Sequence, residues 1–450
     1  MKKFILTLLA IIAGLLILLS LLAPTLLGFS ITQLSNAVRV STGMGAKLAC
    51  SGRYLSGFSH TRNLDDLASY SPANRLLDLE YDDQVKRVTA TLMGMGETSA
   101  TYRPGLGCTL DIGDTSALDD VTTTPIAHSA AAWPRGNTVT SIVPDQQQRL
   151  EAILQQDNHA GLNTRALLVV QDGELVAEAY GEGITPETPL LGWSMGKSLT
   201  AMMVGRLQAL DPQVDMSRPL FPQWNDDRSA ISMEDLLQMS SGLAFDETYA
   251  PGSDATRMLF RAHSASDIAL QSPLTKAPGE YFSYSSGTTN LLSRWIYDRL
   301  GATPQSNMDF FYQQILAPLG MRHTTFEVDG SGVFVGSSYI YASARDWARL
   351  GLLMLQNGDW NGEQLLSADW VTDAQTPNQS DNEPRYGYQF WLNSGGDELR
   401  YPELPADSYF MLGNREQIVM ISPSTKTVMV RLGWSKKNYP TGENFAQFLP

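Results

Sequence analysis

Charged residues, cysteine and histidine are all scarce in this chain. Only 18% of its 450 residues are charged, and 47 acidic residues against 32 basic ones give a net charge of −15. Nucleic-acid binding needs clustered Lys and Arg, so this balance argues against a nucleic-acid partner and against wide contact with anionic lipid headgroups. The five histidines show no ligand-like spacing, and we therefore expect no metal and no other cofactor.

Long apolar runs are confined to the N-terminus. Lys2 and Lys3 precede an uncharged segment, Phe4–Phe29, and the next charged residue is Arg39. This segment exceeds the ~20 residues that span a bilayer, and it lacks the A-x-A pattern of signal cleavage. Residues 1–30 are therefore predicted to be a single-pass membrane anchor, with a cleaved signal as the alternative. Either way the rest of the chain would lie on the periplasmic side of a bacterial inner membrane.

The only two cysteines are Cys50 and Cys108. In an exported chain the simplest interpretation is one disulfide, which would stabilise the fold by about 4 kcal/mol through loop-closure entropy. Two buried thiols are the alternative. Both cysteines fall in residues 31–142, which we interpret as a small accessory domain that ends in a Pro- and Gly-containing linker, 131–137.

Strand and helix patterns divide the chain further. Alternating β-branched residues in 85–93 and 98–103 predict a hairpin within the accessory domain, after a short helix at 73–80. Residues 143–450 form the larger domain, which begins with a helix. Apolar runs around Asp172-Gly173 predict a second hairpin, and 416–433 predicts two more strands.

Between these strands the pattern is mainly helical. Met195, Leu199, Met202, Met203 and Leu207 recur at the spacing of a buried helix. Strands at both ends of the larger domain and helices between them predict an α+β fold. In it, an antiparallel sheet of chain-distant strands is flanked by helices and carries a helical insert.

Three reactive-site patterns overlap on Ser194 in the stretch GWSMGKS, 192–198. A phosphate-binding loop would need glycine where the chain has Leu191, so that interpretation fails on spacing. The G-x-S-x-G pattern of an α/β-hydrolase would need a later histidine, for which His323 is the candidate. Few strand signals follow Ser194 before about residue 330, so this remains the weaker alternative.

The third pattern, S-x-x-K, pairs Ser194 with Lys197. On a helix these side chains lie on one face one turn apart. Burial would lower the pKa of the lysine amine from about 10.4, which would let the amine act as a base. Tyr284, just before another amphipathic stretch, is a candidate second proton carrier, with an ordinary packed aromatic as the alternative.

The motifs around these residues resemble one known superfamily. They are TPLLGWSMGKSLTAMMVG, ISMEDLLQMSSGLAFDETY, PGEYFSYSSGTTNLL and YASARDWARLGLLMLQNG, in this order and spacing. Together they resemble the serine β-lactamase and penicillin-recognising superfamily in its class C branch, nearest to the aminohexanoate-dimer-hydrolase-like serine hydrolases, over residues 145–450. The resemblance implies an acylated Ser194 that exchanges protons with Lys197 and Tyr284. It also implies an oxyanion hole made by the Ser194 N–H and a strand N–H near Phe410.

Two motifs depart from the family pattern. The Y-x-N motif appears as Tyr284-Ser285-Ser286, which puts Ser286 where an amide orients substrate. The K-T-G strand motif falls at Asp407-Ser408-Tyr409, which has no lysine to attract a substrate carboxylate. Efficient β-lactam turnover is therefore not expected.

Acidic residues near these motifs suggest a substrate preference. Asp407, together with Asp246 and Glu247 beside Tyr249, would put negative charge near the substrate and favour a neutral or amine-bearing one. The sequence thus predicts an anchored serine hydrolase that cleaves a small ester or amide. The alternative class is a non-hydrolytic sensor or cell-wall-binding module on the same fold.

Overall fold

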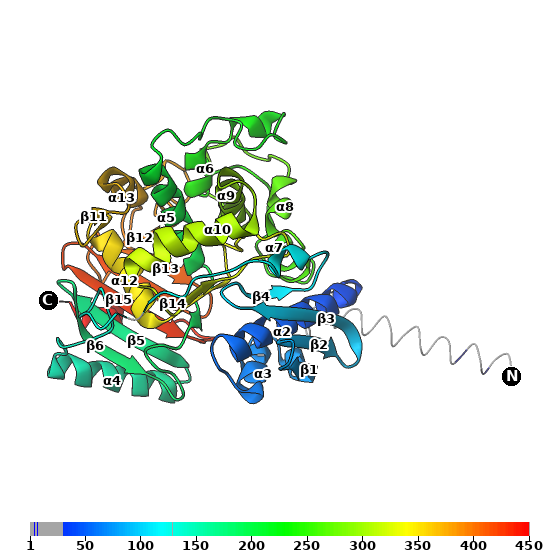
Figure 1. Cartoon of the computed structure of the whole chain (residues 1–450), viewed down its shortest axis with the longest axis horizontal. Coiled ribbons are helices and arrows are strands. Elements are labelled where there is room, and N and C mark those ends of the chain that lie inside the picture. Colours follow the sequence, from blue (N-terminus) through cyan, green and yellow to red (C-terminus); the bar gives the residue numbers. More distant parts are fainter. Residues whose placement is uncertain (1–3, 5–6, 8–29, 128, 450) are drawn as a thin grey trace.

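A six-stranded antiparallel sheet with helices on both faces forms the core of the larger domain (Figure 1). This computed structural model describes residues 4, 7, 30–127 and 129–449. The strand order is β12-β13-β14-β15-β5-β6, so strands from distant parts of the chain pair with each other, as predicted. The strands are Thr164–Gln171 (β5), Glu174–Tyr180 (β6), Trp391–Leu392 (β12), Tyr409–Gly413 (β13), Gln417–Ser422 (β14) and Thr427–Gly433 (β15).

Turn chemistry explains the hairpin between β5 and β6. Asp172 and Gly173 both have positive φ, 48° and 87°, which is the backbone that a two-residue type I′ turn requires. β5 then pairs with β15, where Leu168 lies opposite Val430. Both strands are buried on both faces, so their sequences are continuous apolar runs rather than alternating patterns.

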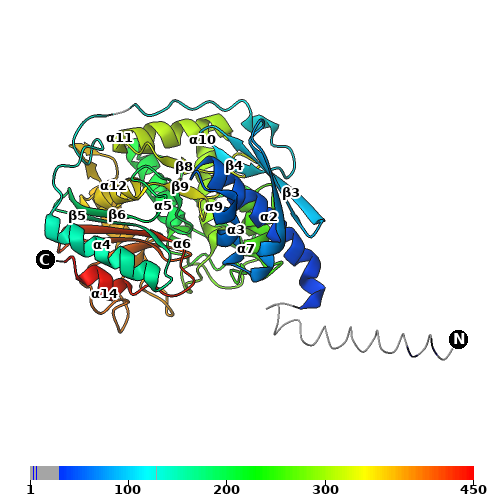
Figure 2. The ribbon, with the colours of Figure 1, turned by 90° about the horizontal axis from the view of Figure 1, so that it is seen from below.

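Helices cover the two faces of the sheet (Figure 2). One face packs on α4 (Pro144–His159) and α14 (Thr441–Ala446), and the other on α5 (Met195–Leu210) and α12 (Ala344–Leu355). The predicted helical insert is confirmed. Its helices are α6 (Met233–Leu237), α7 (Asp254–Arg261), α8 (Ala265–Leu270), α9 (Ser286–Arg299), α10 (Pro304–Phe311) and α11 (Ala317–Leu319). The remaining elements of the larger domain are α13 (Ala368–Ala374) and the short strands β7 (Leu190–Leu191), β8 (Thr324–Phe326), β9 (Ile340–Ala342), β10 (Asp359–Trp360) and β11 (Glu363–Gln364).

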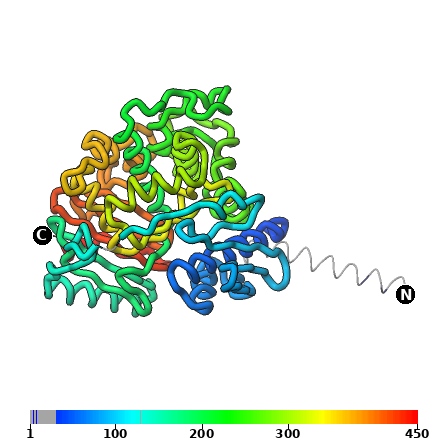
Figure 3. Tube along the Cα trace, viewed as in Figure 1, coloured from blue at the N-terminus to red at the C-terminus, as the bar shows by residue number. Residues whose placement is uncertain are grey.

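The accessory segment carries two helices and its own four-stranded antiparallel sheet. These are α2 (Leu34–Tyr54), α3 (His60–Ala68), β1 (Leu77–Asp82), β2 (Arg87–Leu92), β3 (Met95–Arg103) and β4 (Gly107–Leu110). The β2–β3 hairpin confirms the prediction. The helix predicted for 73–80 is wrong in its second half, because a 3₁₀ turn ends at Leu76 and β1 follows. The chain then crosses from β4 to α4 as an extended connection (Figure 3).

Helix α2 was not predicted, because its sequence is rich in small and β-branched residues that are poor helix formers. Tertiary packing stabilises it instead. A Cβ on Gly43 would lie 2.3 Å from the Phe260 carbonyl oxygen, and one on Gly45 would lie 3.1 Å from Leu77. The small residues therefore allow α2 to pack closely against α7 and against the accessory sheet.

The accessory segment shares its core with the larger domain. Leu191, Trp193 and Trp434 pack among the apolar residues of α2 and β1–β4. The buried Lys47 ammonium of α2 pairs with the buried Glu327 carboxylate. The predicted Cys50–Cys108 disulfide is present beside this pair, with its Cα atoms 6.0 Å apart, and the Cys108 N–H donates to Glu327 at 2.7 Å.

The anchor predicted for residues 1–30 falls almost wholly outside the described residues. Within the residues that the structure describes, no helix is both long and apolar enough to cross a membrane. The first long described helix, α2, carries three basic side chains, Arg39, Lys47 and Arg53.

Replacing Lys47 with methionine should destabilise the protein by about 3–5 kcal/mol, because the change leaves the Glu327 carboxylate buried and unpaired. Urea unfolding measures the change. Arg53→Met is the matched control, since its pair with Asp83 is exposed and should contribute at most about 1 kcal/mol. Equal losses in the two variants would contradict the prediction.

Candidate active site

Ser194 occupies a tight turn between β7 and α5. Trp193, just before it, adopts a left-handed backbone with φ of 48°, and Ser194 is the N-terminal cap residue of α5. Close packing holds this turn on both sides. A Cβ on Gly192 would lie 2.3 Å from the Trp347 ring, and one on Gly196 would lie 2.8 Å from the Gly336 carbonyl oxygen. The turn leaves Ser194 partly exposed to solvent while its neighbours are buried.

Lys197 lies one helical turn further on, with its amine against the serine hydroxyl. Its Nζ donates to Ser194 Oγ at 3.1 Å, to Ser286 Oγ at 3.0 Å and to the Ser337 carbonyl oxygen at 3.1 Å. All three acceptors are neutral, and the side chain is only 1% exposed. Burial therefore lowers the lysine pKa to about 8, although the nearby Glu247 charge acts in the opposite direction.

Tyr284 completes the group that the sequence predicted. It precedes α9, its ring centroid lies 4.8 Å from Lys197 Nζ, and Ser194 is close enough to act on its pKa, in the lowering direction. Trp391 of β12 stacks on the ring at 5.4 Å. Burial raises the pKa of Tyr284, so the phenol keeps its proton at neutral pH. It is therefore suited to donate a proton, whereas Lys197 is suited to accept one.

Glu247, which the sequence placed near the substrate, lies at the site through a contact with Ser286 that the sequence did not predict. Ser286 Oγ donates to Glu247 Oε1 at 2.5 Å, and the Ser286 N–H donates to Oε2 at 2.8 Å. The Tyr249 hydroxyl donates to the same carboxylate at 2.9 Å. Ser286 thus links the Lys197 amine to a carboxylate at the N-terminus of α9. Two features of the sequence pointed toward this contact: Ser286 in the third position of the Y-x-N motif, and the acidic Glu247 in FDETY.

Asp407 does not contribute charge to this group. Its carboxylate accepts hydrogen bonds from the Ser424 N–H and the Ser424 hydroxyl, both at 2.8 Å, and so closes the turn between β14 and β15. This turn lies at the opposite end of β13 from Gly413, the residue that packs beside the Ser194 turn. Asp246 likewise accepts from the Thr248 N–H at 3.0 Å. The prediction that Asp407 puts negative charge near the substrate is therefore wrong. Of the three predicted acids, Glu247 is the one that contacts the site.

The backbone N–H of Phe410 is used within the sheet. Phe410 has Trp391 of β12 on one side and Met420 of β14 on the other. β12 pairs only with Tyr409 and Phe410, so β13 has an unpaired edge after Phe410. That edge runs toward the nucleophile, because a Cβ on Gly413 would lie 2.2 Å from the Gly192 carbonyl oxygen. The strand N–H predicted near Phe410 is better placed one or two residues beyond it.

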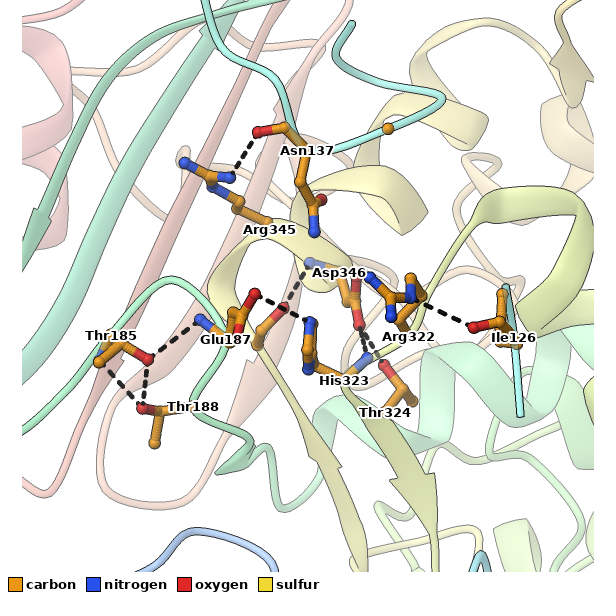
Figure 4. Close-up of polar contacts among 12 residues, drawn as sticks. Ile126, Asn137, Thr185, Glu187, Thr188, Arg322, His323, Thr324, Arg345 and Asp346 are labelled. Carbon is orange, nitrogen blue, oxygen red and sulfur yellow. Dashed lines mark hydrogen bonds and ion pairs between the residues drawn. The ribbon is translucent and has the colours of Figure 1, made fainter. Parts of the chain in front are cut away.

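His323, the alternative partner of Ser194, lies in a different setting (Figure 4). Its ring faces Glu187, with Nε2 3.8 Å from Oε1, and its backbone N–H donates to Asp346 at 2.9 Å. The Ser194 hydroxyl is bonded by Lys197 instead. The main sheet is also antiparallel throughout, so the α/β-hydrolase alternative is wrong. Among the described residues, no group of three or more His, Cys, Asp or Glu could hold a metal ion.

A serine that opens one buried helix, a lysine on its first turn and a tyrosine at the start of a second helix characterise the β-lactamase and transpeptidase-like superfamily of serine hydrolases. Within this class, the chain belongs to the Beta-lactamase family, which matches residues 148–446. The accessory segment precedes the matched region.

Individual relatives are more distant. The chain is 27% identical to the 6-aminohexanoate-dimer hydrolase of Paenarthrobacter ureafaciens over 53% of its own length and 61% of the relative. It is 28% identical to Protein flp of Staphylococcus aureus over 41% of its length and 39% of the relative. The chain thus spans less than two thirds of these relatives. A solved structure provisionally named 6-aminohexanoate-dimer hydrolase, from Bacillus anthracis, is 21% identical and superposes with a TM-score of 0.54 over 75% of this chain and 87% of that one.

Burial of Lys197 makes stability depend on pH in a defined direction. Its folded pKa of about 8 lies below the unfolded value of 10.5, so the folded state binds fewer protons between these values. The free energy of unfolding is therefore highest above pH 10.5, where Lys197 is neutral in both states, and it falls as the pH drops to about 8. The wild type should therefore gain about 3 kcal/mol from this group between pH 7.5 and 10.5.

Lys197→Met should lack that gain. The difference in unfolding free energy between wild type and variant, measured by urea titration at several pH values, should change by about 3 kcal/mol over this interval. Lys437→Met is the control, because that amine is exposed and bonds only a surface carbonyl. A difference that does not vary with pH would refute a depressed Lys197 pKa.

Proposed function

We propose that the protein is a serine hydrolase that cleaves an ester or amide through an acyl-enzyme on Ser194. The observation that carries the proposal is the buried Lys197 amine, 3.1 Å from the serine hydroxyl, with a pKa lowered to about 8. A base with a pKa near the working pH combines a usable neutral fraction with sufficient basicity. Membership of a family of hydrolases supports the same reaction type.

Proton transfer follows from the two pKa shifts. Neutral Lys197 removes the Ser194 proton as Oγ attacks the substrate carbonyl carbon, and the resulting ammonium is stabilised through Ser286 by Glu247. Tyr284 donates its proton to the leaving alcohol or amine and recovers one from Lys197. Water then attacks the acyl group with these proton transfers reversed, which releases the acid and restores the serine.

Charge on the carbonyl oxygen needs two hydrogen-bond donors. We assign one to the Ser194 N–H and the other to the unpaired edge of β13 beyond Phe410, which lies against Gly192. Removal of one such donor typically costs about 10²–10³-fold in rate. The open edge of the strand therefore has a chemical role in this proposal.

Substrate class and location extend the proposal. The Glu247 carboxylate, bonded to Ser286 beside Lys197, puts negative charge at the site, which favours neutral or amine-bearing substrates over anionic ones. We also propose that the enzyme works outside the cytoplasm, tethered by residues 1–30. The Cys50–Cys108 disulfide supports this location, because such bonds persist in oxidising compartments.

A fluorophosphonate probe tests the reaction type. We expect a stoichiometric adduct on Ser194, located by peptide mass spectrometry, and a loss of labelling rate of about 10³-fold in Lys197→Ala because no base remains. His323→Ala is the control and should label at the wild-type rate. Absence of a Ser194 adduct in the wild type would favour the non-hydrolytic binder.

Glu247→Gln should move the pH profile of labelling toward lower pH. The carboxylate raises the Lys197 pKa, so its loss lowers that pKa and lets the neutral amine persist in more acidic solution. We expect the acidic limb to shift down by about one unit. Glu187→Gln, beside His323, should leave the limb in place. An upward shift, or none, would contradict the link through Ser286.

A further inference from the structure

Tyr70 of the accessory segment lies between the two backbone elements that flank the nucleophile. It follows α3, and its ring packs edge-on against Trp193 at 6.1 Å and against Trp434 at 5.7 Å. The Arg415 guanidinium lies 3.9 Å from the ring centroid, and the Tyr70 hydroxyl donates to Asn414 Oδ1 at 3.2 Å. One side chain thus contacts the residue before Ser194 and the hairpin after β13.

Both of these contacts are close to the proposed oxyanion donors. Trp193 has the left-handed φ of 48° that directs the turn, and the next N–H belongs to Ser194. Non-glycine residues keep such a backbone only when their surroundings enforce it, at a cost of about 1–3 kcal/mol. Here the Trp193 ring is enclosed by Tyr70, Trp434 and Tyr339. The strained turn therefore depends on packing that residues 31–142 complete.

The opposite donor depends on the β13–β14 hairpin. Arg415 and Glu416, at its tip, also have positive φ, 64° and 63°. Tyr70 contacts this tip through the Asn414 hydrogen bond and through the Arg415 guanidinium. A single ring of the accessory segment thus contacts side chains on both elements that carry the proposed donors, Trp193 before Ser194 and the Asn414–Arg415 tip after β13.

Further contacts fix the position of α3 and Tyr70. Asp66 of α3 forms an ion pair with Arg165 of β5 at 2.5 Å, and both are largely buried. The Trp434 indole N–H donates to the Asp66 carbonyl oxygen at 3.1 Å and to Ser69 Oγ at 3.0 Å. These contacts fix α3, and with it Tyr70, to the main sheet of the larger domain.

We propose that Tyr70 is a positioning residue, through which the accessory segment sets the spacing of the two oxyanion donors. The inference rests on the proposed hydrolase function. It assigns residues 31–142 a part in transition-state stabilisation rather than in substrate binding. Loss of the ring should relax the turn and the hairpin independently and so reduce kcat while KM stays nearly constant.

The experiment compares Tyr70→Phe and Tyr70→Leu in the full chain, with p-nitrophenyl acetate as substrate. Phenylboronic acid, which forms a tetrahedral adduct on a nucleophilic serine, reports on the oxyanion site without turnover. Misplacement of groups by about 1 Å costs on the order of 10²-fold, so Tyr70→Leu should lose about 10–100-fold in kcat and in boronate affinity. Tyr70→Phe, which lacks only the Asn414 bond, should lose about threefold in both.

Tyr54→Leu is the matched control. Tyr54 also belongs to the accessory segment and packs on Tyr102 at 5.7 Å, but it bonds the exposed Asp83. This variant should lower the melting temperature without changing kcat or boronate affinity.

The outcomes separate the two proposals. The positioning role is overturned if the wild type labels at Ser194 while every Tyr70 variant that folds keeps wild-type kcat and boronate affinity. It is also overturned if Tyr54→Leu loses as much as Tyr70→Leu. A wild-type chain that no fluorophosphonate labels would overturn the hydrolase proposal, and the positioning role with it.

Discussion

Burial of the Lys197 amine among neutral oxygens is the constraint on which the rest of the site depends. A lysine in this position would be costly if charged, and its depressed pKa is the result. The nearest anion, Glu247, acts through Ser286 rather than by direct contact, so it moderates the depression without cancelling it. The same burial raises the pKa of Tyr284. The pKa of Lys197 is thus lowered and the pKa of its neighbour Tyr284 is raised, so that the first suits a proton acceptor and the second a proton donor.

Local spacing decided which parts of the site the sequence could predict. Ser194 and Lys197 are three residues apart on one helix, so their contact follows from helix geometry alone. Tyr284 was a candidate from its place before a second amphipathic stretch, and the family resemblance then implied its role. The contact between Glu247 and Ser286 joins segments whose separation no local rule bridges. Asp407 was misplaced because a carboxylate beside a turn can bond the turn, and the sequence does not show which way it points.

The fold followed the same division. Hairpins with defined turn residues and helices with regular apolar spacing were predictable, because their determinants lie within a few residues of each other. Helix α2 was missed because its small residues disfavour a helix locally, and only their close packing on Phe260 and the accessory sheet stabilises it. For the same reason, residue 142 divides the chain by sequence pattern but not by packing, since Trp193 and Trp434 lie in the accessory core.

That shared core has a consequence for how the chain is made. Residues 34–110 leave the ribosome well before the apolar side chains that complete their core, from Leu191 to Trp434. The accessory sheet must therefore wait, with an unfilled apolar face, until β15 and the residues after it are present. Folding of the accessory segment is thus coupled to Trp434, directly after β15, so chains interrupted before Trp434 should be substrates for chaperones and proteases rather than partly active enzymes.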